Sequence, residues 1–219
     1  MKALIVQNHP ADPLGLLAPF FKQRKVDFEV VFGPKQMLSG HSFDFLVVLG
    51  GPPNAHDSLG YLEEEKKLIK QANSEGKKVL GICLGAQLAS VAFGGSSKPL
   101  MKGEVGMTHF NVLDNWFFRG VKPFFFESHN DWITPPKGAK VLAESTGVQA
   151  FSFENVIGIQ FHAEATPASA KKMLLRRPKW QWHTNALGKQ RNWIKNQETE
   201  MRENAFALFD NVFFPGVRH

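Results

Sequence analysis

Cys83, the only cysteine in the chain, stands where a nucleophile could be displayed. It lies in KKVLGICLGAQLAS, residues 77–90, between an apolar run and an Ala-rich stretch that is typical of a helix start. Gly81 and Gly85 lie two residues before and two after it, and small residues there let a strand turn sharply into a helix. The positive end of that helix favours a thiolate, and its free amides could hold an oxyanion. The competing interpretation is an inert cysteine that fills space in the core.

A thiol nucleophile needs a base, and the base needs a group that orients it. The segment VIGIQFHAE, residues 156–164, offers both in His162 and Glu164. If the segment is a strand, residues two apart project from the same face, so the carboxylate can hold the imidazole in one tautomer. The sequence therefore predicts a Cys–His–Glu triad with Cys83 as the nucleophile.

Two further segments follow apolar runs and could line the same cleft. In VVLGGPPNAHD, Gly50 and Gly51 lack a Cβ, so their backbone N–H groups could approach a ligand closely and form an oxyanion hole. The alternative there is an ordinary turn. His129, in FFFESHNDW, also stands at an expected strand end. Because ligands of open α/β sheets bind beyond the carboxyl ends of the strands, we expect these segments to converge near Cys83.

The pattern of apolar residues predicts the sheet that would bring these segments together. In the first half of the chain, short runs rich in Val, Ile and Leu alternate with stretches of helical spacing, as in a parallel sheet with crossover helices. We expect strands at KALIVQ (2–7), VDFEVVF (26–32), DFLVVLGG (44–51) and KVLGI (78–82), and helices at PLGLLAPFFKQRK (13–25), YLEEEKKLIKQANSEGKK (61–78) and LGAQLASVAFGG (84–95).

The second half has closely spaced apolar segments separated by turn residues, which favours antiparallel or mixed strands added to the same sheet. These segments are THFNVL (108–113), FFFES (124–128), AKVLAES (139–145), VQAFSFE (148–154) and VIGIQFH (156–162). Roughly the last 50 residues return to helical spacing. The predicted fold class is therefore α/β, with a mixed, mainly parallel sheet flanked by helices on both faces.

The chain has 219 residues, which suits one domain, and its single cysteine cannot form an internal disulfide. The N-terminus lacks the apolar segment of a signal peptide, and no apolar run approaches the length of a membrane span. We therefore expect a cytoplasmic protein without a membrane partner.

The net charge of +6 comes from one segment, because residues 171–195 carry eight Lys or Arg and no acid, which leaves the rest of the chain at about −2. Trp180, Trp182 and Trp193 lie among these basic residues, a mixture that can bind nucleic acid. No nucleic-acid motif accompanies them, so we favour a solvated helical face with Trp anchors and expect no nucleic-acid partner. The alternative is a surface that docks an acidic partner or covers the mouth of the cleft.

Five short motifs together resemble the class I, triad-type glutamine amidotransferases. They are GGP (50–52), GICLGAQ (81–87), GEVG (103–106), SHND (128–131) and QFHAE (160–164), in the order and approximate spacing of that family. Residues 128–145 are similar in style to the glutaminase domain of GMP synthase and its free-standing relatives. The resemblance implies a flavodoxin-like single domain over residues 1–219, with the family core at 1–170 and a helical C-terminal extension at 171–219.

The resemblance also implies a glutaminase that needs no cofactor and no metal. Cys83 would attack the side-chain amide of glutamine, and His162, held by Glu164, would protonate the departing ammonia. Water would then release glutamate from the γ-glutamyl thioester. Eight further residues would take supporting roles: the backbone amides of Gly51 and Leu84 as the oxyanion hole, Gln87, Ser128, His129 and Asn130 as substrate contacts, and Glu104 and Gly106 as the pocket wall.

The sequence departs from the family at two points. Ala163 stands where family members commonly have proline, which loosens the backbone between His162 and Glu164 but leaves both side chains in place. The ATP-pyrophosphatase signature that GMP synthase carries downstream is missing, so any synthase that consumes ammonia would be a separate subunit, or there is none. A γ-glutamyl peptidase would use the same triad and is the alternative enzyme. A non-catalytic protein that has kept the fold is the alternative from another class.

Overall fold

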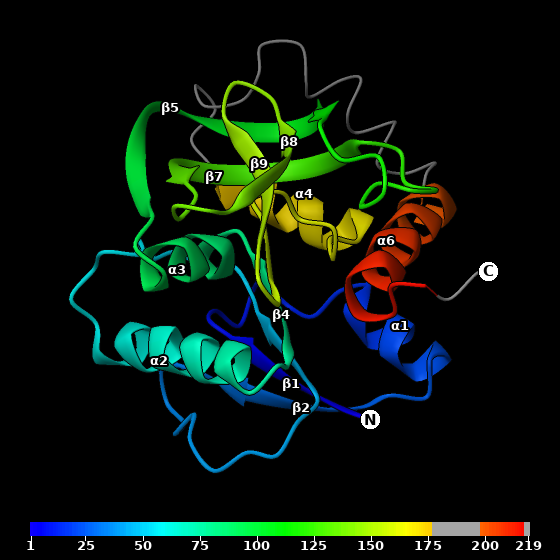
Figure 1. Cartoon of the computed structure of the whole chain (residues 1–219). Coiled ribbons are helices and arrows are strands. Elements are labelled where there is room, and N and C mark those ends of the chain that lie inside the picture. Colours follow the sequence, from blue (N-terminus) through cyan, green and yellow to red (C-terminus); the bar gives the residue numbers. More distant parts are fainter. Residues whose placement is uncertain (177–197, 217–219) are drawn as a thin grey trace.

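The computed structural model describes residues 1–176 and 198–216. Eight strands form its main sheet: β1 (Lys2–Gln7), β2 (Asp27–Phe32), β3 (Phe45–Val48), β4 (Lys78–Ile82), β6 (Asn111–Val112), β8 (Lys140–Glu144), β9 (Val148–Phe153) and β10 (Val156–Ile159). Their order is β2-β1-β3-β4-β10-β9-β8-β6 (Figure 1). The first five in this order run parallel, and β9, β8 and β6 continue the sheet antiparallel. The predicted mixed, mainly parallel sheet is confirmed.

Helices cover both faces of this sheet, as predicted. The described helices are α1 (Leu17–Gln23), α2 (Gly60–Ser74), α3 (Leu84–Ala92), α4 (Pro167–Arg176) and α6 (Glu198–Phe213). α1 and α6 lie on one side of the sheet, and α2 and α3 lie on the other (Figure 1). The middle of β1 is apolar at every position because both of its faces are buried. Ala3 and Ile5 pack in the core with α1 and α6, whereas Leu4 and Val6 pack in the core with α2 and α3.

Two long strands, β5 (Ser96–His109) and β7 (Phe124–Thr134), form a separate antiparallel pair. The prediction that THFNVL and FFFES both add strands to the main sheet is therefore wrong, since only the dipeptide of β6 joins its edge. The pair finds apolar partners of its own. Val105 and Phe126 pack with α4, and Phe125 stacks on Phe161 with ring centroids 4.5 Å apart.

α4 crosses residue 170, where the sequence resemblance divides a core from a C-terminal extension. Ala170 and Met173 of this helix both pack in the cluster that contains Val105 and Phe126. The single domain and its division at residue 170 remain predictions. Trp180, Trp182 and Trp193 lie outside the described residues. Among residues 1–176 and 198–216, no helix combines the length and apolar character needed to cross a bilayer.

Candidate active site

Cys83 occupies a sharp turn between β4 and α3. Its φ of 52° and ψ of −107° lie where residues with a side chain are seldom found. A Cβ on Gly85 would lie 2.0 Å from the carbonyl oxygen of Val48, and one on Gly81 would lie 2.5 Å from the carbonyl oxygen of Gly85. Neither gap admits a side chain, so the turn requires both glycines. This is the backbone geometry that sequence analysis expects of a nucleophile elbow.

His162 and Glu164 are in contact, with Nδ1 of the imidazole 2.7 Å from Oε1 of the carboxylate. Both side chains are buried. The strand that was expected to pair them is absent, because β10 ends at Ile159 and the chain turns before His162. The backbone N–H of His162 instead donates to the carbonyl oxygen of Phe126 in β7, at 2.8 Å. The expected contact is present, but a turn held against β7 makes it.

Cys83 and His162 flank Gly50, since a Cβ on that glycine would lie 3.1 Å from Cε1 of His162 and 3.4 Å from Cβ of Cys83. Burial alone would lower the pKa of His162. The charge of Glu164 and a hydrogen bond with Cys83 outweigh burial and raise the pKa well above its usual range. The raised pKa favours the cationic form of the imidazole.

The two residues expected to form an oxyanion hole lie side by side. A Cβ on Gly51 would be 3.2 Å from Cδ2 of Leu84, and Gly51 lines the same pocket as Cys83. Leu84 is the first residue of α3, so its N–H has no partner within the helix. Two backbone amides beside the sulfur can therefore face a developing negative charge.

Asn8 and Glu65, which sequence analysis missed, support the loop that carries Gly51. Nδ2 of Asn8 donates to the carbonyl oxygen of Leu49 at 3.1 Å and to Oε2 of Glu65 at 3.1 Å. Burial raises the pKa of Glu65 to about 8, so its carboxyl is neutral at pH 7. Asn8 follows β1 and Glu65 lies on α2, 57 positions further along the chain, so no local sequence pattern indicates their contact.

The sulfur of Cys83 faces a pocket of about 410 Å³, a size that suits a small molecule. Its lining includes four of the expected substrate contacts, namely Gln87, Ser128, His129 and Asn130. Glu104 and Gly106 are not among the residues that line it. The Glu104 carboxylate lies against His129, and Gly106 faces Glu127 across the strand pair.

Three further residues line the pocket: Asp12, Met173 and Arg176. Sequence analysis missed Asp12, whereas Met173 and Arg176 lie in the basic segment 171–195, for which covering the mouth of the cleft was the alternative. Arg176, at the end of α4, forms an ion pair and a hydrogen bond with Asp12, which follows β1. Because these residues are 164 positions apart, no local pattern indicates the contact.

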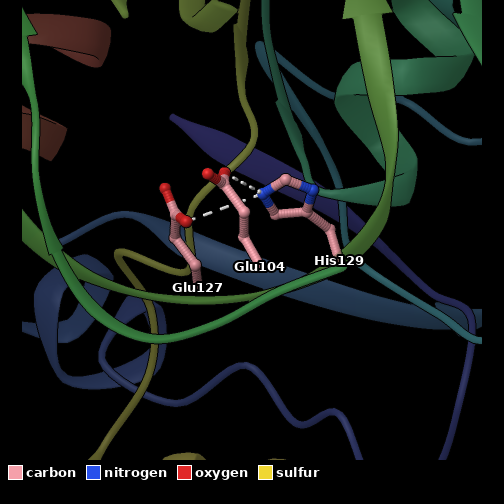
Figure 2. Close-up of side chains that lie close together, drawn as sticks. All are labelled: Glu104, Glu127 and His129. Atoms are coloured by element: carbon pink, nitrogen blue, oxygen red, sulfur yellow. Dashed lines mark ion pairs between the residues drawn. The ribbon is translucent and has the colours of Figure 1, made fainter. Parts of the chain in front are cut away.

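His129 is buried in the pocket wall with two carboxylates against one ring nitrogen (Figure 2). Nε2 lies 3.1 Å from Oε2 of Glu104 and 3.7 Å from Oε2 of Glu127. Burial alone would lower the pKa of His129, but the two carboxylates raise it to about 9, and burial raises the pKa of Glu127 to about 7. Burial would also raise the pKa of Glu104, but His129 and Thr146 lower it to about 2. Glu127 was missed, although it alternates with His129 along one strand.

An open α/β sheet with a cysteine on a strand-to-helix turn and a buried histidine–carboxylate pair beside it is the arrangement that the motif resemblance predicts. The class-I glutamine amidotransferase family matches residues 17–182. The chain therefore belongs to the class-I glutamine amidotransferase family, and the resemblance found in the motifs is confirmed.

Relatives and solved structures agree with this family. A glutamine-hydrolyzing GMP synthase subunit from Sulfolobus acidocaldarius is 35% identical over 130 residues, which cover 56% of this chain and 68% of the relative. The corresponding subunit from Saccharolobus solfataricus is 33% identical over 146 residues, covering 63% of this chain and 76% of the relative. A crystal structure of a glutamine amidotransferase from Thermotoga maritima matches with a TM-score of 0.85 at 22% identity, covering 98% of each chain, and shows the same fold.

Proposed function

We propose that this protein is a glutaminase that hydrolyses the side-chain amide of glutamine and supplies ammonia to an acceptor on another protein. The observation that carries the proposal is the constellation of Cys83 on its strained turn and the buried His162–Glu164 pair beside it. Membership of the class-I amidotransferase family supports the choice of glutamine as the substrate.

In the first half of the proposed reaction, Sγ of Cys83 attacks the carbonyl carbon of the glutamine side chain. The amides of Gly51 and Leu84 hold the tetrahedral oxyanion, and loss of one such donor costs about 3 kcal/mol of barrier stabilisation. The imidazolium of His162 donates its proton to the leaving nitrogen, which departs as ammonia. The carbon–nitrogen bond is thereby replaced by a γ-glutamyl thioester on Cys83.

In the second half, water replaces ammonia beside His162. The neutral imidazole takes a proton from the water as it attacks the thioester, and the sulfur leaves as glutamate is released. Glu164 holds Nδ1 of His162 at 2.7 Å in both halves, which keeps the other ring nitrogen available to the reacting atoms.

The pocket residues supply the remaining contacts to glutamine. Gln87 lies one helical turn after Cys83 on α3 and reaches the amino acid end of the substrate, while Ser128 and Asn130 border the same space from β7. His129 lines the same wall, where both of its ring nitrogens face protein groups, so it shapes the pocket beside the substrate.

The relatives from Sulfolobus and Saccharolobus are described as subunits of a glutamine-hydrolyzing synthase. We therefore extend the proposal to a separate synthase subunit that takes up the ammonia. A cytoplasmic location is part of the same proposal, because the lone cysteine has no partner for an internal disulfide.

The test is covalent labelling with a diazoketone analogue of glutamine, followed by mass spectrometry of the peptide that contains Cys83. We expect modification of Cys83 and release of glutamate from glutamine, and we expect Cys83→Ala to lose both. Labelling needs no synthase, so a missing partner does not mask the result. Hydrolysis of a γ-glutamyl dipeptide without hydrolysis of glutamine would show a γ-glutamyl peptidase instead. Activity that survives Cys83→Ala would contradict the thiol mechanism.

A further inference from the structure

Glu127 is a fully buried carboxylate whose two oxygens accept no hydrogen bond from any residue that the structure describes. On the neighbouring strand its direct partner is Gly106, so no side chain from that position faces it. A buried carboxylate without hydrogen-bond donors is unstable unless a cation or a proton accompanies it. Its nearest cation among the described residues is His129, whose Nε2 lies 3.7 Å from Oε2 without forming a hydrogen bond, so the carboxylate lacks a cation in direct contact.

Three potential ligands converge at this place (Figure 2). The register of β5 and β7 sets Glu104 directly opposite His129, and Glu127 lies on the same face two residues away. Their ligand atoms all lie within 4.8 Å of one another. Two ligands about 2.1 Å from one ion lie roughly 3.0–3.4 Å apart. Nε2 lies 3.1 Å from the Glu104 carboxylate, within this range, and 3.7 Å from the Glu127 carboxylate, slightly beyond it, so a bound ion would draw Glu127 closer.

The orientation of His129 fits the same role. Nδ1 lies 3.0 Å from the carbonyl oxygen of Asp131, so this nitrogen donates its proton there, and Nε2 presents a lone pair once a metal ion displaces its proton. Although an oxygen of Glu104 lies 3.1 Å from Nε2, the two atoms are not aligned as a hydrogen bond. Metal-binding histidines commonly donate the other ring N–H to a backbone carbonyl in this way.

Glu104 is held in place by its own partners. Thr146 Oγ1 donates to one of its oxygens, and Nε2 of Gln149 donates to the other at 3.0 Å. Bound carboxylates are typically fixed by such outer hydrogen bonds. Once a bound ion displaces the protons of the cluster, the two carboxylates carry two negative charges, which a divalent ion balances.

We propose that Glu104, Glu127 and His129 bind one divalent first-row transition-metal ion behind the wall of the glutamine pocket. One imidazole and two carboxylates suit ions such as Zn²⁺ or Mn²⁺, whereas Ca²⁺ and Mg²⁺ prefer oxygen ligands alone. Binding releases the protons that the cluster holds in the metal-free protein. The ion ties β5 to β7 and fixes His129 in the pocket wall. The inference does not depend on the proposed glutaminase activity, because neither Cys83 nor His162 is a ligand.

The test measures metal content and thermal stability rather than activity. Untagged protein is stripped with a chelator, mixed with Zn²⁺ and desalted, and the zinc retained per chain is measured by mass spectrometry of the elements. We expect one ion per chain and a rise in Tm of about 5–10 °C when free zinc exceeds the Kd a hundredfold. Glu127→Gln should lose both effects. Glu65→Gln removes another fully buried carboxyl and should keep both.

The thiol of Cys83 beside His162 is a competing zinc site, so the measurements are repeated in Cys83→Ala. Retention of zinc in this variant supports the proposal, and Co²⁺ bound to wild-type protein should show no thiolate-to-metal charge-transfer band. Three results would overturn it: no retained zinc in wild-type protein, equal retention in Glu127→Gln, or loss of the ion in Cys83→Ala. The first needs no variant, so the proposal remains testable if Glu127→Gln does not fold.

Discussion

Two buried histidines line the same pocket, and their partners give them different chemistry. In His162 a carboxylate engages Nδ1 at 2.7 Å, and the other ring nitrogen is left for Cys83. In His129 a backbone carbonyl engages Nδ1, and two carboxylates lie against Nε2. The first histidine can therefore exchange protons with a reacting group, whereas the second is closed on both sides. The comparison teaches that the role of each imidazole depends on which of its two ring nitrogens contacts a carboxylate.

The largest expected effect comes from removing one carboxylate from each histidine. Glu164→Gln should lower kcat for glutamine by roughly 10²–10⁴-fold, because an amide does not stabilise the imidazolium or fix its tautomer. Glu127→Gln also replaces a carboxylate with an amide, but Glu127 lies behind His129 and does not line the pocket, so kcat should fall by at most about tenfold. Steady-state glutamate release measures both, with Cys83→Ala as the baseline. An equal fall in kcat in the two variants would show that the two histidines do not differ in their role in the reaction.

The contrast also explains what could be predicted from the sequence. The spacing of Gly81, Cys83 and Gly85 is local, and so are the apolar runs of the parallel strands, so the turn and that half of the sheet could be read directly. The His162–Glu164 contact was identified by assuming a strand, although a turn makes it. Glu127 could not be found in this way, because its role depends on a strand register that joins residues far apart in the chain.

The turn itself can be tested by adding one methyl group. Gly85→Ala places a Cβ 2.0 Å from the carbonyl oxygen of Val48, so we expect a loss of about 3 kcal/mol in the free energy of unfolding. Gly60→Ala is the matched control, because a Cβ there meets no atom within 4 Å at the start of α2, and it should be neutral or slightly stabilising. Urea denaturation measures both. Similar values would mean that the strained turn does not fix the position of Cys83.

Glu65 provides a third buried carboxyl, one whose partner is an amide instead of a histidine. The folded protein keeps the Glu65 proton up to a pKa of about 8, whereas the unfolded chain releases it near the usual value of 4.5. Since the unfolded state then binds fewer protons, stability should fall as the pH rises through this window. Between pH 6 and pH 8 the loss should be about 2–3 kcal/mol.

Glu65→Gln removes this titration, so its urea midpoint should vary less between pH 6 and pH 8 than that of wild-type protein. The difference between the two proteins isolates Glu65 from other titrating groups. A variant with the same pH dependence as wild type would show that the carboxyl is ionised in the folded state, and that burial without a histidine is not enough to keep it neutral.

The smallest effect is expected at the rim, where the charged pair is partly open to water. The Arg176 side chain is 37% exposed and pairs with Asp12. Exposed ion pairs contribute about 1 kcal/mol or less, so Arg176→Ala should raise KM for glutamine by at most about fivefold and leave kcat nearly constant. Lys172→Ala, an exposed cation on the same helix, should change neither. A fall in kcat comparable to that of Glu164→Gln would place a catalytic charge on α4 and extend the reactive part of the pocket beyond its two histidines.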